Sequence, residues 1–197
     1  MRIAIDIDDT LGNFSDTLFK YALEYDKKLR SNGVINDSKY VVDGKFDWTK
    51  KETDYFYKNY IELVGHNLVP FKNAKEVIDK LRDEENKIII ISARSKDYID
   101  AYKMTLDWLK RYKINIDEIY LGFEDKALKA KELDIDVFLD DRPSICKRVS
   151  AMGIKTYIYD SKYNHNYVLD GVERVSNWDE FYSKVKGGKV YEKKYNS

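Results

Sequence analysis

The sequence predicts an α/β fold that is built on a parallel sheet of five to six strands, with a small helical segment inserted after the first strand. From residue 73 onward, short apolar runs alternate with amphipathic helical stretches, which indicates parallel strands joined by right-handed crossovers. Between residues 14 and 71, apolar residues recur at helical spacing instead, and the next convincing strand begins only at about residue 88. Because a simple strand–helix–strand unit returns to the sheet within ~30 residues, this stretch is interpreted as a helical insert.

Hydrophobic periodicity and end signals place the individual elements. Strands are expected at residues 3–5, 87–91, 118–121, 137–139 and 156–159, with a short edge strand at 174–175. Helices are expected at residues 14–29, 49 to about 65, 73–81, 98–109, from about 125, 143–152 and 178–185. Thr49 with Glu52 is typical of a capping box, Asn73 is a candidate cap, and Gly65 is a candidate stop. Residues 187–197 are expected to form a flexible tail.

Composition limits the classes of function. The 197 residues suffice for one domain with an insert, and Lys+Arg and Asp+Glu balance at 35 each. No net charge therefore attracts nucleic acid or anionic lipid, and neither a polynucleotide nor a membrane partner is expected. No apolar run reaches ~18 residues and a strand begins at residue 2, so a cytoplasmic protein is expected. Cys146 is the single cysteine, and we expect a small buried apolar side chain there rather than a nucleophile.

The first strand ends in a cluster of acidic residues, Asp6, Asp8 and Asp9. Alternate residues of an extended chain point to opposite faces, so Asp6 and Asp8 share a site only if the chain bends after Asp6, which Thr10 and Gly12 favour. Carboxylates this close repel one another unless a cation lies between them. The pattern therefore predicts a hard divalent cation, Mg²⁺, and an acidic surface turn is the alternative.

Polar residues also end or follow three later strands. Ser92 ends the second, Lys126 follows the third, and Asp140 and Asp141 end the fourth. Since the carboxyl ends of parallel strands lie along one edge of a sheet, these side chains are expected to meet Asp6 there.

Together these residues resemble the motifs of the haloacid dehalogenase (HAD) superfamily: Asp6-Ile7-Asp8-Asp9-Thr10 matches DxDxT, and Ser, Lys and Asp-Asp follow in that family's order. The resemblance implies a HAD-like Rossmannoid three-layer fold, with residues 1–13 and 72–186 as the core domain and residues 14–71 as a helical cap. The cap position, the run NLVPFKNAKEVIDKL and the DDRP ending are similar to the 5'(3')-deoxyribonucleotidase group, also called 5' nucleotidase type C.

The resemblance implies a role for each acidic residue. Asp6 is expected to be the nucleophile that forms an aspartyl-phosphate, and Asp8 the general acid and then base. Mg²⁺ would be held by Asp6, the backbone carbonyl of Asp8, and Asp140. Thr10 and Asp141 are expected behind these ligands, with Asp141 as a direct or water-mediated ligand in the alternative. The role of Asp9 stays open.

Phosphate contacts are expected from Ser92, Lys126 and Arg94. Lys129 lies one helical turn after Lys126 and is the alternative lysine. Arg94 is equally compatible with an ion pair to an acid outside the site.

The implied substrate is a nucleoside monophosphate, with a pyrimidine deoxyribonucleotide as one candidate. Phe46 and Trp48 are either part of an aromatic pocket for its base or part of the cap interior. The alternatives are a HAD phosphatase for a sugar phosphate or another small phosphomonoester, and a catalytically silent HAD scaffold that only binds. A homodimer is compatible with all three.

Overall fold

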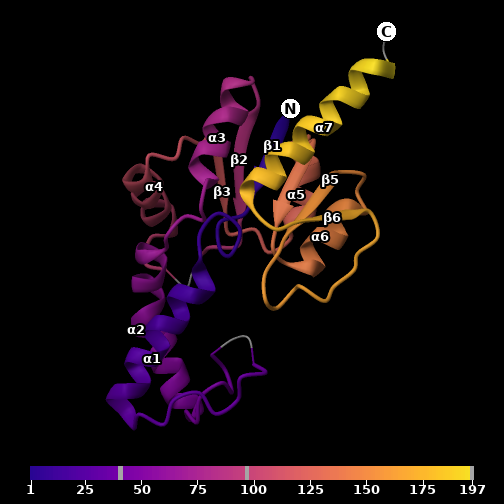
Figure 1. Cartoon of the computed structure of the whole chain (residues 1–197). Coiled ribbons are helices and arrows are strands. Elements are labelled where there is room, and N and C mark those ends of the chain that lie inside the picture. The colour runs from indigo at the N-terminus through magenta and orange to yellow at the C-terminus, as the bar shows by residue number, and fades with distance from the viewer. Residues whose placement is uncertain (40–41, 96–97, 196–197) are drawn as a thin grey trace.

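The structure is a computed structural model that describes residues 1–39, 42–95 and 98–195, with the side chains of residues 188–195 outside that description. Within these residues six strands form one sheet: β1 (Arg2–Ile5), β2 (Lys87–Ser92), β3 (Glu118–Leu121), β4 (Val137–Asp140), β5 (Lys155–Tyr159) and β6 (Val172–Val175). All neighbouring pairs are parallel, and the strand order is β3-β2-β1-β4-β5-β6. The predicted parallel α/β sheet with an edge strand near residue 174 is therefore confirmed, and β1 lies inside it (Figure 1).

Helices cover both faces of the sheet, which gives three layers (Figure 1). They are α3 (Ala74–Asp83), α4 (Ala101–Tyr112), α5 (Lys126–Glu132), α6 (Pro143–Ser150) and α7 (Trp178–Tyr195). Alternate residues of β2 pack against the helices on opposite faces of the sheet. Ile88 and Ile90 pack with residues of α3, α4 and α7, and Ile89 and Ile91 pack with residues of α5 and α6. An unbroken apolar run is what a strand covered on both faces requires.

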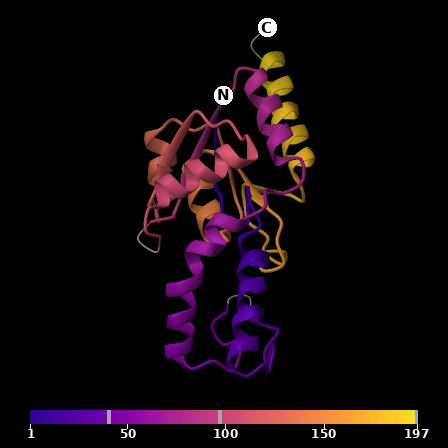
Figure 2. The same ribbon diagram turned by 90° about the vertical axis from the view of Figure 1, so that its left-hand side faces the viewer.

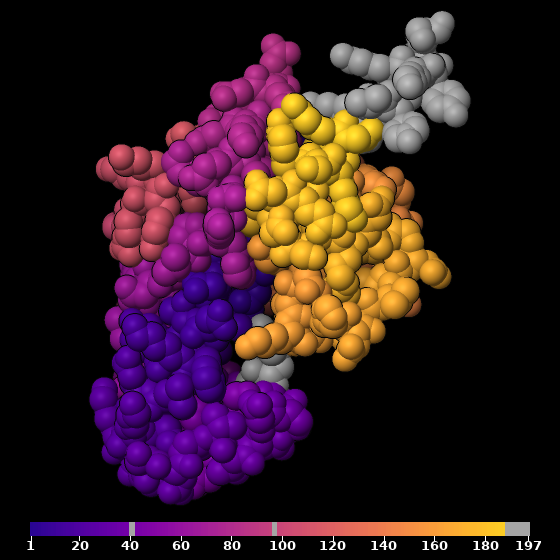
Figure 3. Space-filling view, in the orientation of Figure 1, coloured from indigo at the N-terminus to yellow at the C-terminus, as the bar shows by residue number. Residues whose placement is uncertain are grey.

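The remaining helices, α1 (Phe14–Leu29) and α2 (Lys50–Asn67), lie in the segment where the helical insert was predicted. They pack against each other and extend away from the carboxyl ends of the strands (Figures 1 and 2). The capping box of Thr49 and Glu52 at the start of α2 is present. The loop between β5 and β6 approaches this cap across a crevice to which Lys39, Lys162 and Tyr163 contribute (Figure 3).

Gly65 does not end α2, contrary to the sequence prediction, because the helix continues to Asn67. A Cβ atom at Gly65 would lie 2.5 Å from Sδ of Met104 and 2.8 Å from Cε1 of Tyr98. Glycine is therefore used here for the close approach of α2 to α4, and α2 ends just before Pro70.

Gly65→Ala is expected to lower the free energy of unfolding by ~1–3 kcal/mol, because the added methyl group must displace Met104 or Tyr98. Gly187→Ala is the matched control, since Gly187 is also helical and a Cβ there meets nothing within 4 Å. Denaturant unfolding of both variants checks this, and an unfolding free energy for Gly65→Ala equal to or above that of the native chain would contradict it.

Two further expectations differ from the structure. Asn73 has a left-handed φ of 64° and makes no cap hydrogen bond, because its amide donates to Asp179 at 2.6 Å instead. The apolar spacing within residues 98–109 predicts that Tyr102 points inward, but Tyr102 of α4 is 54% exposed, and Met104 and Trp108 are buried instead. Helix α7 extends to Tyr195, and the flexible tail expected at residues 187–197 stays a prediction.

Cys146 is buried, as predicted, and burial raises the pKa of its thiol well above the ordinary value. Among the described residues, no helix is both long and apolar enough to cross a bilayer. The cytoplasmic location stays a prediction.

Candidate active site

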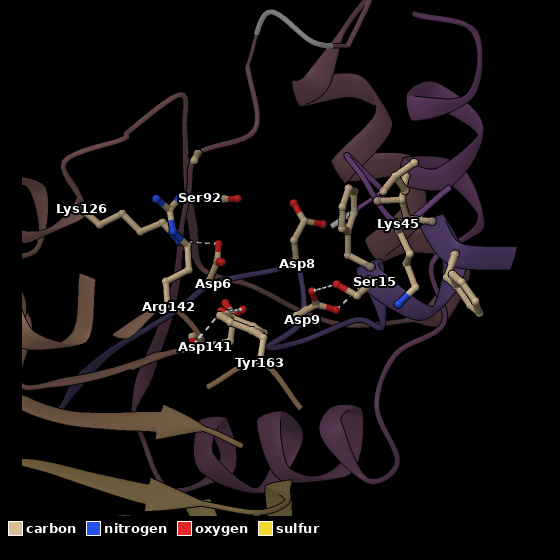
Figure 4. A pocket seen from close by; sticks show the side chains of 15 residues that line it. Asp6, Asp8, Asp9, Ser15, Lys45, Ser92, Lys126, Asp141, Arg142 and Tyr163 are labelled. Atoms are coloured by element: carbon tan, nitrogen blue, oxygen red, sulfur yellow. Dashed lines mark hydrogen bonds and ion pairs between the residues drawn. The ribbon is translucent and has the colours of Figure 1, made fainter. Parts of the chain in front are cut away.

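The chain coils directly after β1, as the spacing of Asp6 and Asp8 requires. The carbonyl oxygen of Ile7 accepts hydrogen bonds from the amides of Leu11 and Gly12, both at 2.9 Å. Asp9 adopts a left-handed φ of 56° within this coil. The side chains of Asp6 and Asp8 consequently line one pocket (Figure 4).

Asp9 supports the first cap helix. Its carboxylate accepts hydrogen bonds from the backbone amide of Ser15, at 2.8 Å, and from the Ser15 hydroxyl. A carboxylate is favourable at this position because the first turn of a helix has unpaired amides. Asp9, whose role the sequence left open, therefore attaches α1 to the coil after β1.

Lys126 forms ion pairs with Asp6 and Asp140, which lie at the carboxyl ends of the neighbouring strands β1 and β4. Its Nζ lies 2.8 Å from Oδ1 of Asp6 and 2.7 Å from Oδ2 of Asp140, and all three side chains are almost completely buried. Burial alone would lower the pKa of Lys126, but the Asp140 and Asp6 carboxylates outweigh it and the pKa is raised. Lys126 therefore carries a permanent positive charge beside Asp6.

Lys129, the alternative lysine, points elsewhere. Its Nζ pairs with Glu132 at 2.7 Å and lies over the rings of Tyr120 and Phe123, 4.8 and 4.9 Å from their centroids. Of the two lysines, Lys126 is thus the one that contacts the acidic cluster.

Asp141 is held in place by two hydroxyl groups. Thr10 donates to its Oδ1 at 3.3 Å, and the Tyr163 hydroxyl donates to its Oδ2. The neighbouring Asp140 accepts from the Arg142 amide at 2.8 Å. These contacts agree with the supporting position expected for Thr10 and fix the direction of both carboxylates.

The residues present fit a hard divalent cation. One carboxylate oxygen from each of Asp6, Asp140 and Asp141 lies within 4.8 Å of the others, and all three residues are buried. Three carboxylates and the ammonium of Lys126 leave two negative charges uncompensated. Apart from its ion pair with Lys126, Oδ1 of Asp6 accepts no hydrogen bond from the described residues. An all-oxygen, doubly negative group is the donor set that Mg²⁺ prefers, and Asp141 belongs to it.

The crowding also affects protonation. Burial, together with the charges of Asp140 and Asp6, raises the pKa of Asp141 well above its ordinary value, and burial raises that of Asp140. The folded, metal-free protein therefore binds a proton at a pH where the unfolded chain does not.

In EDTA, lowering the pH through the raised pKa of Asp141 is expected to stabilise the native chain relative to Asp141→Asn, with the gain complete near the ordinary value of about 4. Stability rises as the pH falls because the folded state binds this proton at a higher pH than the unfolded state does. Added Mg²⁺ should remove this dependence and stabilise the native chain at neutral pH. Unfolding curves of both proteins across this pH range test it, and a difference that is independent of pH and Mg²⁺ would contradict it.

Arg94 lies differently from the expected phosphate contact. Its Nε is 3.0 Å from Oδ2 of Asp8, its Nη2 is 2.5 Å from Oδ1, and its Nη1 donates to Thr105 at 3.4 Å. The Arg94 side chain is 1% exposed. The ion-pair partner of Arg94 is therefore Asp8, an acidic residue inside the site and not outside it.

The pocket extends from the acidic cluster to the cap and encloses about 470 Å³. Ser92, at the end of β2, and Lys126 line its core side. The cap contributes an apolar wall and one cation: Phe14, Leu18, Phe19, Val42 and Lys45. The site thus combines a charged end with a mainly apolar end (Figure 4).

Phe46 and Trp48 pack in the cap interior, which is one of the two alternatives expected for them. Phe46 is 2% exposed and stacks on Trp48 with ring centroids 4.5 Å apart. The indole of Trp48 donates to Asp26 at 2.9 Å. The described contacts therefore favour the cap-interior alternative for Phe46 and Trp48, since their rings pack on each other and the apolar pocket wall comes mainly from α1.

Sequence reasoning missed several lining residues. Phe14 and Leu18 lie in the helix predicted at residues 14–29, and they form part of the pocket wall. Lys45 and Tyr163 lie in irregular segments where no periodicity marks them. Their polar contacts become visible only once the cap and the loop after β5 are placed.

Comparison with known proteins decides the family. The model of the family described as "5' nucleotidase, deoxy (Pyrimidine), cytosolic type C protein" matches residues 1–191. The chain belongs to this family. It is 27% identical over 186 residues to a nucleotidase of Clostridium acetobutylicum, covering 94% of this chain and 93% of that protein.

Solved structures support the HAD fold of this nucleotidase-family chain. A haloacid dehalogenase-like hydrolase of Streptococcus pneumoniae superposes with a TM-score of 0.66 at 14% identity, covering 93% of this chain and 97% of that one. CbbY of Rhodobacter sphaeroides, in complex with phosphate, gives 0.61 at 13% identity, covering 91% and 95%. At these identities the likeness shows the fold alone. Fold and family together make the chain a HAD phosphomonoester hydrolase, as the motifs predicted.

Proposed function

We propose that the chain is a Mg²⁺-dependent nucleotidase that hydrolyses nucleoside monophosphates through an aspartyl-phosphate on Asp6. One observation carries the proposal: Asp6, Lys126 and Asp140 converge at the charged end of a pocket whose other end is an apolar cap wall. The family match supports the substrate class.

In the first half of the reaction, a carboxylate oxygen of Asp6 attacks phosphorus and the bond to the leaving oxygen breaks. Lys126 neutralises charge on the transferring group, and the hydroxyl of Ser92 donates to a phosphate oxygen. Asp8 gives its proton to the leaving alcohol. In the second half, Asp8 takes a proton from water, which attacks the aspartyl-phosphate and releases phosphate and Asp6.

Asp6, Asp140 and Asp141 would hold Mg²⁺, with the backbone carbonyl of Asp8 as a further ligand. When bound, Mg²⁺ supplies charge neutralisation between the attacking carboxylate and the phosphate. Thr10 and Tyr163 contribute by orienting Asp141.

The nucleoside would lie against the cap wall. A pocket of about 470 Å³ falls in the usual range for a small organic ligand of ~300–1,000 Å³. Phe14 and Phe19 provide flat apolar faces for a base, whereas a sugar phosphate would leave that wall without an apolar partner.

A Mg²⁺-dependent panel of nucleoside monophosphates, sugar phosphates and 4-nitrophenyl phosphate tests the proposal. We expect the highest kcat/KM with nucleoside monophosphates and no turnover in EDTA. Phe19→Ala should lower kcat/KM for nucleotides by ~10-fold or more and spare the aryl phosphate. Higher kcat/KM with sugar phosphates would overturn the substrate class, and full activity in EDTA would overturn the metal requirement.

A further inference from the structure

We infer that Arg94 is a positioning residue for phosphoryl transfer, whose buried guanidinium fixes the direction in which Asp8 presents its carboxylate. The inference rests on the proposed function, in which Asp8 protonates the leaving alcohol. In this role the buried Arg94 assists departure of the leaving group.

The contact between the two side chains is bidentate. Nε and Nη2 of Arg94 face the two carboxylate oxygens of Asp8, at 3.0 and 2.5 Å. A planar fork that engages both oxygens fixes the rotation of a carboxylate as well as its position, which a single ammonium does not. The Asp8 side chain is 26% exposed, and Arg94 is its hydrogen-bond partner among the described residues.

Arg94 itself has little freedom to move. Its Nη1 donates to the hydroxyl of Thr105, a fully buried residue of α4, at 3.4 Å. The ring centroid of Tyr98 lies 5.9 Å from its Cζ, and the Arg94 side chain is 1% exposed. Asp8 therefore has to conform to the guanidinium, and α4 sets the direction of both.

The position of Arg94 relative to the pockets separates this role from phosphate binding. The pocket that contains Asp6 and Lys126 is lined by Asp8, and Arg94 is absent from its described lining. Arg94 instead lines a second cavity of about 620 Å³, together with Tyr98. Asp8 borders both cavities, and its carboxylate is paired with Arg94.

A residue that orients a general acid affects substrates according to their leaving groups. A nucleoside leaves as a poorly stabilised alkoxide and needs a proton in the transition state, whereas 4-nitrophenolate leaves readily without one. The parameter kcat/KM reports only the steps up to departure of the leaving group. Both substrates form the same aspartyl-phosphate, so slower hydrolysis of this intermediate leaves kcat/KM unchanged for both.

The experiment compares Arg94→Met, Arg94→Lys, Thr105→Val and Asp8→Asn in the full chain with Mg²⁺. For Arg94→Met we expect kcat/KM for a nucleoside monophosphate to fall by ~10²-fold and that for 4-nitrophenyl phosphate by less than ~5-fold. Arg94→Lys should recover part of the loss, and Thr105→Val should lose a few-fold in the same direction. The inhibition constant of inorganic phosphate should stay within ~3-fold of the native value, because the guanidinium of Arg94 faces Asp8 and Thr105.

Three outcomes would overturn the inference. Equal falls for both substrates would indicate a purely structural role, and a large rise in the phosphate inhibition constant would indicate a phosphate ligand. If Asp8→Asn discriminates between the substrates and Arg94→Met does not, Arg94 does not position Asp8 and the proposed function stands. If Asp8→Asn itself fails to discriminate, the proposed function fails. Should Arg94→Met not fold, the same comparison is made with Arg94→Lys and Thr105→Val.

Discussion

Asp6→Asn is expected to abolish turnover of every phosphomonoester, with kcat lowered by ~10⁴-fold or more. The amide oxygen of asparagine has nearly the shape of the carboxylate and can still accept a hydrogen bond from Lys126, but it is a poor nucleophile. Phosphate release in the presence of Mg²⁺ measures the effect. Asp83→Asn, at an exposed position at the end of α3, is the control and should retain native activity.

Folding of the same variant separates loss of chemistry from loss of structure. Asp6→Asn removes one of three crowded carboxylates while Lys126 keeps its partner Asp140, so the metal-free variant should be at least as stable as the native chain. An Asp6→Asn protein that is folded and keeps more than about a tenth of native kcat would contradict covalent catalysis by Asp6.

Lys126→Met is expected to have the second largest effect, on both activity and stability. Loss of the buried ammonium leaves the Asp6 and Asp140 carboxylates without a partner, which should cost ~3–5 kcal/mol of unfolding free energy in EDTA. Loss of its charge at the phosphate should lower kcat/KM by ~10²–10³-fold with Mg²⁺ present. Unfolding curves and kinetics on the same preparation measure both effects.

Lys129→Met is the matched control on the same helix. Its ion partner Glu132 is exposed, and such a pair contributes at most about 1 kcal/mol. We expect kcat/KM for Lys129→Met to stay within ~2-fold of the native value, because its ammonium does not reach the acidic cluster. Equal losses for the two variants would contradict the position of Lys126 as the site lysine.

The fold and the centre of the site were predictable because their patterns are local in sequence and regular in space. Buried strands appear as apolar runs, and the residues that end them meet because parallel strands share a carboxyl edge. β1 pairs with both β2 and β4, so Ser92 and Asp140 flank Asp6. The spacing of Asp6 and Asp8 likewise required the coil that the chain forms after Ile7.

The parts that the sequence left open depend on contacts between segments that are far apart in sequence. Arg94 follows β2, as a phosphate ligand would, but Thr105 of α4 and Asp8 determine where its guanidinium lies. Phe46 and Trp48 are aromatic residues of the cap, yet their stacking and the bond to Asp26 place them in its interior. Hydrophobic periodicity in the sequence predicts neither the rotamer of a side chain nor the course of a long loop.

The most direct test of the account is to locate the phosphoryl group on the enzyme during turnover. The native chain is mixed with Mg²⁺ and a nucleoside monophosphate, quenched in acid within one turnover, reduced with borohydride and digested for mass spectrometry. We predict conversion of Asp6, and of no other carboxylate, to homoserine, and no such product from Asp6→Asn. Reduction of a different residue would contradict the account. So would the absence of any reduced residue in a sample that has released its nucleoside but not its phosphate.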